Sequence, residues 1–363
     1  MKSSRLLSLD ILRGITVAGM ILVNNGWGES YEMLQHSKWN GMTPCDLVFP
    51  FFLFIMGISC YLSLVKSEFK PTAPVIRRIV KRTVLLFAIG LFIHWFDNAL
   101  SGDYGFAHLR IWAVLQRIAL CYCAVSLFAL FCNHKYTIPV VIGLLVIYSA
   151  ILIFGNGYAY DADVNILAQA DLKLFGYDHI YHKSPVDPEG LMGTISSVAH
   201  VLLGFYCGKL IRQKETVSDK VIALFVVGTV LVVSGYLLSF GLPINKRIWS
   251  PSYVLVTCGL ASLLQALLMQ IIDSNGGSKL FTLHSSLITF FRVFGVNALA
   301  LYVSSELLQI LLKNIGLSEI IYNGIHAVIP PLKWASLVYA VYFVLLNYAL
   351  GYILYRKKIY IKL

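Results

Sequence analysis

Ten runs of about twenty mostly apolar residues dominate this chain of 363 residues. A run of this length crosses about 30 Å of hydrocarbon as an α-helix, whose backbone groups hydrogen-bond to one another. Charged residues make up only 13% of the chain, roughly half of the ~25% found in soluble domains. We therefore predict an all-α, polytopic transmembrane helical bundle that forms one domain, 1–363. The expected spans are 7–25, 45–65, 79–97, 112–132, 136–155, 191–211, 220–240, 252–272, 290–312 and 335–355.

The charges in the connections predict an orientation. Connections on the side of the termini hold more than twice as many Lys and Arg residues as those on the opposite side. The positive-inside rule and the even number of spans then place both termini in the cytoplasm. The long acidic loop at 156–190 and the connection that carries His36 are expected outside. Contact with anionic lipid of the bilayer accounts for the net charge of +11, so we expect no nucleic-acid partner.

The seven cysteines mostly lie inside apolar runs. None has the spacing of a metal ligand, so we expect neither a metal site nor a disulfide framework. The stretch 36–46, "HSKWNGMTPCD", is unusual because it places polar and ionisable groups directly against an apolar run. Asp10 and Arg13 lie within the first span and, three residues apart, are expected to face each other.

Several long motifs identify a resemblance. "SLDILRGITVAGMILVNN" (8–25) is followed by "HSKWNGMTPCDLVFPFFLFIMG" (36–57), and later by "VDPEGLMGTISS" (186–197) and "PINKRIWSPSYV" (243–254). In this order they resemble the catalytic region of the heparan-α-glucosaminide N-acetyltransferase family. The resemblance covers essentially the whole chain.

The resemblance implies transfer of acetyl from cytoplasmic acetyl-CoA to the amino group of a terminal glucosamine on the far side of the membrane. His36 stands where the family has its catalytic histidine. Asn24 is the better match to the family's active-site asparagine, but its spacing to His36 is one residue longer, which leaves Asn25 open. The resemblance also implies a multi-pass protein of the bacterial inner membrane, and we expect a homodimer.

The chemistry of the residues agrees with this expectation. Acetyl transfer to an amine needs a base, and histidine, with an ordinary pKa near 6.5, suits that task at neutral pH. His36 is therefore expected to act as general base or as transient acetyl carrier. An asparagine amide such as that of Asn24 can donate to the developing oxyanion.

Other polar residues of these motifs are candidates for the substrate site. Asp46 is expected to orient His36, to bind a sugar hydroxyl, or to cap the helix that follows. Glu189 either pairs with the ammonium group of the sugar or caps a helix. Trp39 either stacks on the sugar or anchors the chain at the interface, and Asn40 and Asn25 complete the expected set.

The phosphates of coenzyme A call for arginine and lysine. We expect the cofactor near Arg13 and Arg82, with Asp10 beside Arg13. Arg117, deep in the fourth span, is expected either to pair with Asp10 or to reach the cofactor.

Three other functions compete with this hypothesis. A membrane O-acyltransferase that modifies envelope sugars would use the same donor but form an ester. A secondary transporter would show an internal repeat and broken helices, and the sequence shows neither. An inactive scaffold would not need His36.

Overall fold

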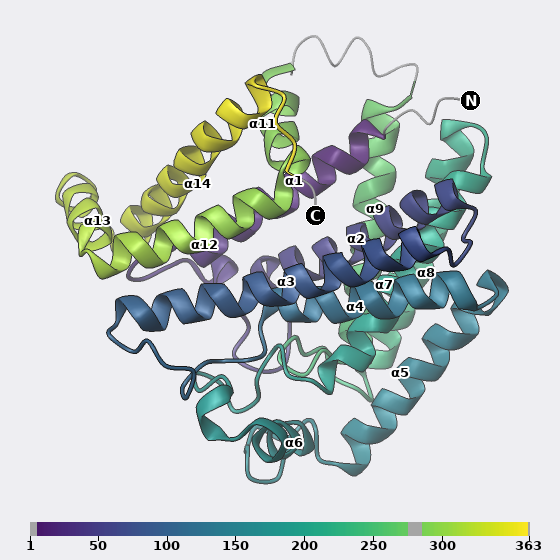
Figure 1. Cartoon of the computed structure of the whole chain (residues 1–363), viewed down its shortest axis with the longest axis horizontal. Coiled ribbons are helices and arrows are strands. Elements are labelled where there is room, and N and C mark those ends of the chain that lie inside the picture. Colours follow the sequence, from purple (N-terminus) through teal and green to yellow (C-terminus); the bar gives the residue numbers. More distant parts are fainter. Residues whose placement is uncertain (1–5, 275–284, 362–363) are drawn as a thin grey trace.

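The computed structural model describes residues 6–274 and 285–361, and these residues form α-helices and short 3₁₀ turns without a strand (Figure 1). The all-α prediction is therefore confirmed for this part of the chain. In chain order the helices are α1 (Leu7–Asn24), α2 (Val48–Leu64), α3 (Ala73–Leu100), α4 (Val114–Phe131), α5 (Thr137–Phe154), α6 (Ile166–Phe175), α7 (Gly193–Gln213), α8 (Val217–Ser239), α9 (Pro251–Ile272), α11 (Ser285–Val296), α12 (Ala298–Asn314), α13 (Leu317–Val328) and α14 (Leu332–Arg356).

Most of the predicted spans are single helices. Nine helices in the described residues are long and apolar enough to cross a membrane, and the number becomes ten if the bent pair α11–α12 counts as one span. The chain is therefore a multi-pass membrane protein. Two further helices, α6 and α13, lie in connections where we had expected none.

The ninth predicted span, 290–312, is wrong as a single helix. It consists of α11 and α12, which meet at Asn297 with a bend of 82°. The described residues therefore contain a broken helix, although the sequence showed no sign of one. An apolar run shows that a segment is buried in lipid or protein, but it does not show whether the helix is straight.

The centre of the bundle is the pair α2 and α7, against which α4, α5 and α9 pack (Figure 1). Gly57 on α2 and Gly204 on α7 allow this contact, because a Cβ at either position would overlap the backbone of the other helix. Small residues let membrane helices approach closely, and van der Waals packing then holds them together. The large apolar core of α2, α4, α7 and α9 forms the scaffold for the loops at one end of these helices.

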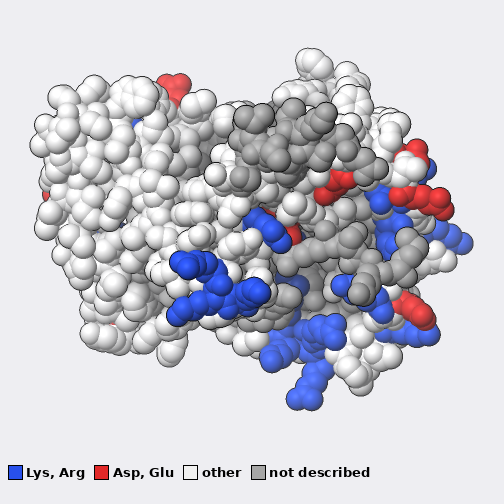
Figure 2. Space-filling model, turned by 90° about the horizontal axis from the view of Figure 1, so that it is seen from above, with Lys and Arg blue, Asp and Glu red and all other residues white. Residues whose placement is uncertain are grey.

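Charge is distributed unevenly over the surface. Figure 2 shows Lys and Arg side chains gathered over the middle and the right of one face, toward the end at which the N-terminus lies in Figure 1. The far left of that face carries few charges. Such segregation is the pattern that the positive-inside rule describes.

Candidate active site

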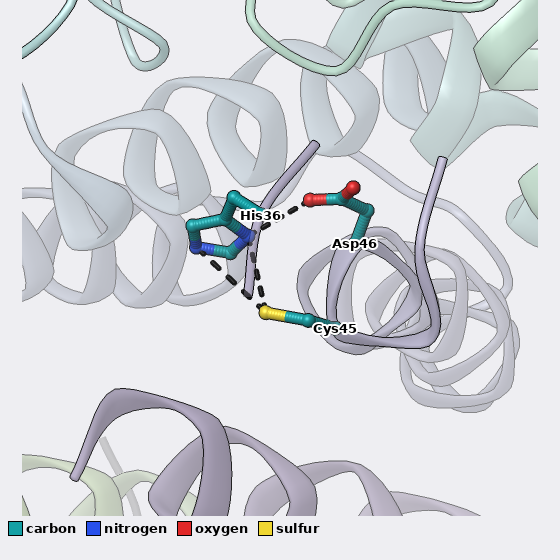
Figure 3. Close-up of side chains that lie close together, drawn as sticks. All are labelled: His36, Cys45 and Asp46. Atoms are coloured by element: carbon teal, nitrogen blue, oxygen red, sulfur yellow. Dashed lines mark hydrogen bonds and ion pairs between the residues drawn. The ribbon is translucent and has the colours of Figure 1, made fainter. Parts of the chain in front are cut away.

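The first element of the candidate site is a histidine held by a buried carboxylate. Asp46 lies in a 3₁₀ turn, Pro44–Leu47, that leads into α2, and His36 lies in the connection before it. His36 Nδ1 is 2.8 Å from Asp46 Oδ1, and Figure 3 shows the two side chains facing each other. The other oxygen, Oδ2, accepts from the backbone N–H groups of Ser37 (3.1 Å) and Thr43 (3.0 Å).

This geometry selects the tautomer of His36. An ionised carboxylate only accepts hydrogen bonds, so His36 Nδ1 carries the proton and donates it to Asp46. Nε2 then keeps its lone pair, and the imidazole is 37% exposed while Asp46 is fully buried. Asp46 therefore holds the His36 ring and caps the turn that leads into α2. A role for Asp46 in sugar binding stays a prediction.

Cys45 adds a third potential ligand beside this pair. Its Sγ lies 3.1 Å from His36 Nδ1, and the ligand atoms of His36, Cys45 and Asp46 lie within 4.8 Å of one another (Figure 3). A metal would have to share this space with the ammonium group of Lys246, whose Nζ is 2.9 Å from His36 Nδ1 and 3.5 Å from Asp46 Oδ1. The ammonium group of Lys246 thus already supplies positive charge at this place. The arrangement of His36, Asp46 and Lys246 suits acid–base chemistry.

Lys246 is the residue that sequence reasoning missed. It lies between α8 and α9 within "PINKRIWSPSYV", the motif quoted above without a role for any of its residues. The motif reaches His36 because Gly41 N donates to Ile244 O at 2.7 Å and Asn245 Nδ2 donates to Asn40 Oδ1 at 3.2 Å. The sequence offered one signal, a lysine within a long motif between two spans, and this signal did not reveal the long-range contact with His36.

Two of the expected sugar-site residues also serve the fold. Asn40 contacts Asn245, as described, and Trp39 Nε1 donates to Tyr158 O at 3.0 Å. The Trp39 ring also meets Tyr160 edge-on, with ring centroids 5.3 Å apart. These contacts join the His36 connection to the long loop at 156–190, and a role for either residue in sugar binding stays a prediction.

Asn24 and Asn25 differ in their surroundings. Asn24 is exposed, and its Nδ2 donates to Glu306 Oε1 at 3.2 Å. Asn25 is buried, and its Nδ2 donates to Ile21 O at 2.7 Å within α1. Among the described residues, neither side chain has a hydrogen bond to His36. Asn24 is the more accessible of the two.

A charged cluster covers the "DPEG" turn near Lys246. Arg110 binds both Asp187 (2.7 Å) and Glu189 (2.9 Å). Burial by itself raises the pKa of Glu189, but the positive charges of Arg110, Arg117 and Lys246 outweigh it, so this pKa lies below its ordinary value. Glu189 is therefore held as a carboxylate, and the cation that it binds in this structure is Arg110.

Arg117 does not pair with Asp10. Its guanidinium donates to Pro188 O (2.7 Å) and Gly190 O (2.8 Å), and it lies 5.1 Å from the centre of the Trp249 ring. Arg117 therefore ties α4 to the "DPEG" turn, on the side of the bundle where the His36 connection lies.

The remaining cofactor candidates join helices to one another. Asp10 and Arg13 form the expected ion pair at 3.2 Å, and Arg13 also donates to Ser59 Oγ at 2.8 Å and Gly295 O at 3.3 Å. Arg82 lies over the Tyr122 ring, 4.4 Å from its centre. These contacts link α1 to α2 and α11, and α3 to α4. Binding of coenzyme A by these residues stays a prediction.

The fold and the site together define a class: a multi-pass membrane protein with a carboxylate-oriented histidine able to act as a base. Comparison with known proteins names the family. The model of the heparan-alpha-glucosaminide N-acetyltransferase catalytic region matches residues 5–236, more than half of the chain. The chain therefore belongs to this family of acetyltransferases.

Two curated relatives carry the same name. The Mus musculus heparan-alpha-glucosaminide N-acetyltransferase is 28% identical over 85% of this chain and 54% of its own length. The Homo sapiens protein is 28% identical over 84% of this chain and 53% of its own length. The chain thus spans about half the length of the curated relatives it matches.

Proposed function

We propose that this protein transfers an acetyl group from cytoplasmic acetyl-CoA to the amino group of a terminal glucosamine on the extracytoplasmic side. The observation that carries the proposal is the imidazole of His36, which is partly exposed and fixed by the buried carboxylate of Asp46. Membership of the acetyltransferase family supports the choice of reaction.

In the proposed reaction, His36 accepts the proton that the amine releases. Its Nε2 takes the proton from the attacking amine, while Asp46 stabilises the imidazolium that forms. The same nitrogen is the one able to attack the thioester and carry the acetyl group for a moment. Both routes need Nδ1 to stay on Asp46, and the 2.8 Å contact provides this.

The surroundings suit the two substrates. Arg82 and the neighbouring inner-side arginines offer positive charge for the phosphates of coenzyme A, with Arg13 and Asp10 near them. Asn24, Trp39, Asn40 and the carboxylate of Glu189 lie in connections or at helix ends on the side proposed for the sugar. We place the protein in the bacterial inner membrane as a homodimer, which cross-linking in native membranes would test.

The direct test is a transfer assay. Purified protein is given isotope-labelled acetyl-CoA and a panel of amino sugars, and the products are identified by mass spectrometry. We expect label on glucosamine and none on N-acetylglucosamine, whose amine is already blocked. A product that hydroxylamine cleaves would be an ester, and would identify an O-acyltransferase instead.

His36→Ala is the decisive variant. Its removal leaves no cavity in the core because the side chain lies at the surface, so the protein should fold and keep the rise in melting temperature that coenzyme A produces. The rate should fall by about 10²–10⁴. A folded His36→Ala protein that works at the normal rate would show the proposed mechanism to be wrong.

A further inference from the structure

The position of Lys246 relative to His36 is unusual. Lys246 Nζ lies 2.9 Å from Nδ1 and 3.2 Å from Nε2 of the same ring. An ammonium group this close to both nitrogens cannot lie in the ring plane, because it would overlap Cε1, which lies between them. It therefore lies over the face of the imidazole, where the lone pair of Nε2 does not point. That lone pair stays available for the proton of a substrate.

The segment that carries Lys246 is held rigidly. Tyr148 of α5 donates to Ile248 O at 2.5 Å, and Ser196 of α7 donates to Trp249 O at 2.7 Å. The Lys246 side chain is only 10% exposed, and Asp46 is its ion-pair partner at 3.5 Å. Both ends of the contact with His36 are thus positioned by buried hydrogen bonds.

The ammonium group has hydrogen-bond capacity left. It carries three N–H donors, and in the described residues its polar contacts are the position over the His36 ring and the ion pair with Asp46. Burial lowers the pKa of Lys246, although Asp46 and Glu189 oppose that effect. A lower pKa makes an ammonium group a stronger donor toward an oxygen that gains negative charge.

We propose that Lys246 is a second catalytic residue of the acetyl transfer and donates an N–H to the acetyl oxygen as that oxygen becomes an oxyanion. A reacting carbon must lie within reach of both the base and the oxyanion donor, and Lys246 touches the base itself. Asn24, the donor expected from the sequence, gives one N–H of its amide to Glu306. This inference rests on the proposed function.

The step balances without any further reactant. The amine nitrogen attacks the carbonyl carbon, the C–N bond forms, and the π electrons of the carbonyl move to its oxygen beside Lys246. His36 Nε2 takes the proton from nitrogen. The C–S bond then breaks, the carbonyl reforms, and the sulfur leaves and takes the proton from His36. Lys246 keeps its own protons throughout and supplies only charge.

The test compares Lys246→Met, Lys246→Gln and Lys246→Arg with Lys38→Met, which removes the same charge from an exposed position of the His36 connection. The formation of N-acetylglucosamine gives kcat and KM, and the melting temperature with and without coenzyme A reports folding and donor binding. We expect Lys246→Met and Lys246→Gln to lower kcat by about 10²–10³. Their response to coenzyme A should persist, Lys246→Arg should lose less, and Lys38→Met should match the wild type.

The outcomes separate the two proposals. A folded Lys246→Met or Lys246→Gln protein whose kcat stays within about threefold of the wild type overturns the role of Lys246 and leaves the proposed function intact. Equal losses of kcat and of the coenzyme A response in all three variants also overturn it, because Lys246 would then serve binding or folding. A wild-type protein that acetylates no amino sugar overturns the proposed function itself.

Discussion

At the scale of single residues, the two oxygens of Asp46 have different partners. Oδ1 faces His36 Nδ1, while Oδ2 accepts from two backbone N–H groups and lies 3.2 Å from the hydroxyl of Thr43. The two backbone N–H donors at Oδ2 require an acceptor at that place. The side chain therefore cannot turn over without losing those bonds.

Asp46→Asn tests this asymmetry. The oxygen of the asparagine should take the place of Oδ2, which leaves its NH₂ group facing His36 Nδ1. His36 must then accept on Nδ1 and hold its proton on Nε2, the nitrogen that should be the base. We expect kcat for amino-sugar acetylation to fall by about 10²–10⁴. The melting temperature should also fall, because the buried Lys246 loses the charge of its ion-pair partner. Normal kcat in a folded protein would contradict the orienting role.

Asp171 on α6 predicts a dependence of stability on pH. Burial raises its pKa to about 6, partly offset by a hydrogen bond from Leu191 N. The folded protein thus holds this proton more tightly than the unfolded chain, whose Asp pKa is about 3.9. The stability that this proton contributes is fully present below about pH 4 and is lost as the pH rises through about 6, by at most about 3 kcal/mol.

Asp171→Asn should remove that loss, because asparagine keeps the acceptor for Leu191 N and carries no charge. Its melting temperature in detergent should match the wild type near pH 4 and exceed it above pH 6.5. Asp178→Asn, an exposed acid of the same loop, is the matched control and should leave the pH profile unchanged. A difference between Asp171→Asn and wild type that does not grow with pH would refute the assignment.

At the scale of elements, the bend between α11 and α12 is joined to the C-terminal tail. Asn297 is buried at the break, its Nδ2 donates to Ile359 O at 3.0 Å, and its Oδ1 accepts from Ile361 N at 2.9 Å. One amide side chain thus binds the tail on both sides of Tyr360, as a neighbouring strand would.

Asn297→Ala should release the tail. Two backbone groups of the exposed tail lose their partners, and each lost hydrogen bond costs about 0.5–1.5 kcal/mol. We expect a lower melting temperature and faster trypsin cleavage around Arg356 and Lys357, read by mass spectrometry. Asn314→Ala, whose side chain bonds only to Ile310 O within its own helix, should change neither. Unchanged cleavage in Asn297→Ala would disprove the docking.

At the scale of the whole molecule, the orientation in the membrane can be read with cysteines. Cys132 is an exposed native cysteine at the end of α4, on the side proposed to be cytoplasmic. Lys173 is exposed on α6 in the loop proposed to be outside. An impermeant maleimide applied to intact spheroplasts should label Lys173→Cys in a Cys132→Ser background, and should label Cys132 only after permeabilisation. The reverse pattern would invert the topology and move the active site to the cytoplasm.

The sequence predicted most of the helices, because a helix that meets lipid must be apolar over a length set by the bilayer. It did not predict the bend at Asn297, since an apolar run looks the same whether its helix is straight or broken. It also did not reveal α6, whose ten residues are too few to span and lie in a polar loop.

The candidate site divides in the same way. His36 and Asp46 are ten residues apart, so both could be found in one local motif. Two residues this close in the chain can come into contact without long-range packing. Lys246 lies 210 residues from His36, and Arg110 lies 77 residues from Asp187. The proposed base and its carboxylate partner could therefore be identified from the sequence alone. The charges around the base were decided by the tertiary structure, because only the packing of α2, α5, α7 and α9 brings those distant connections together.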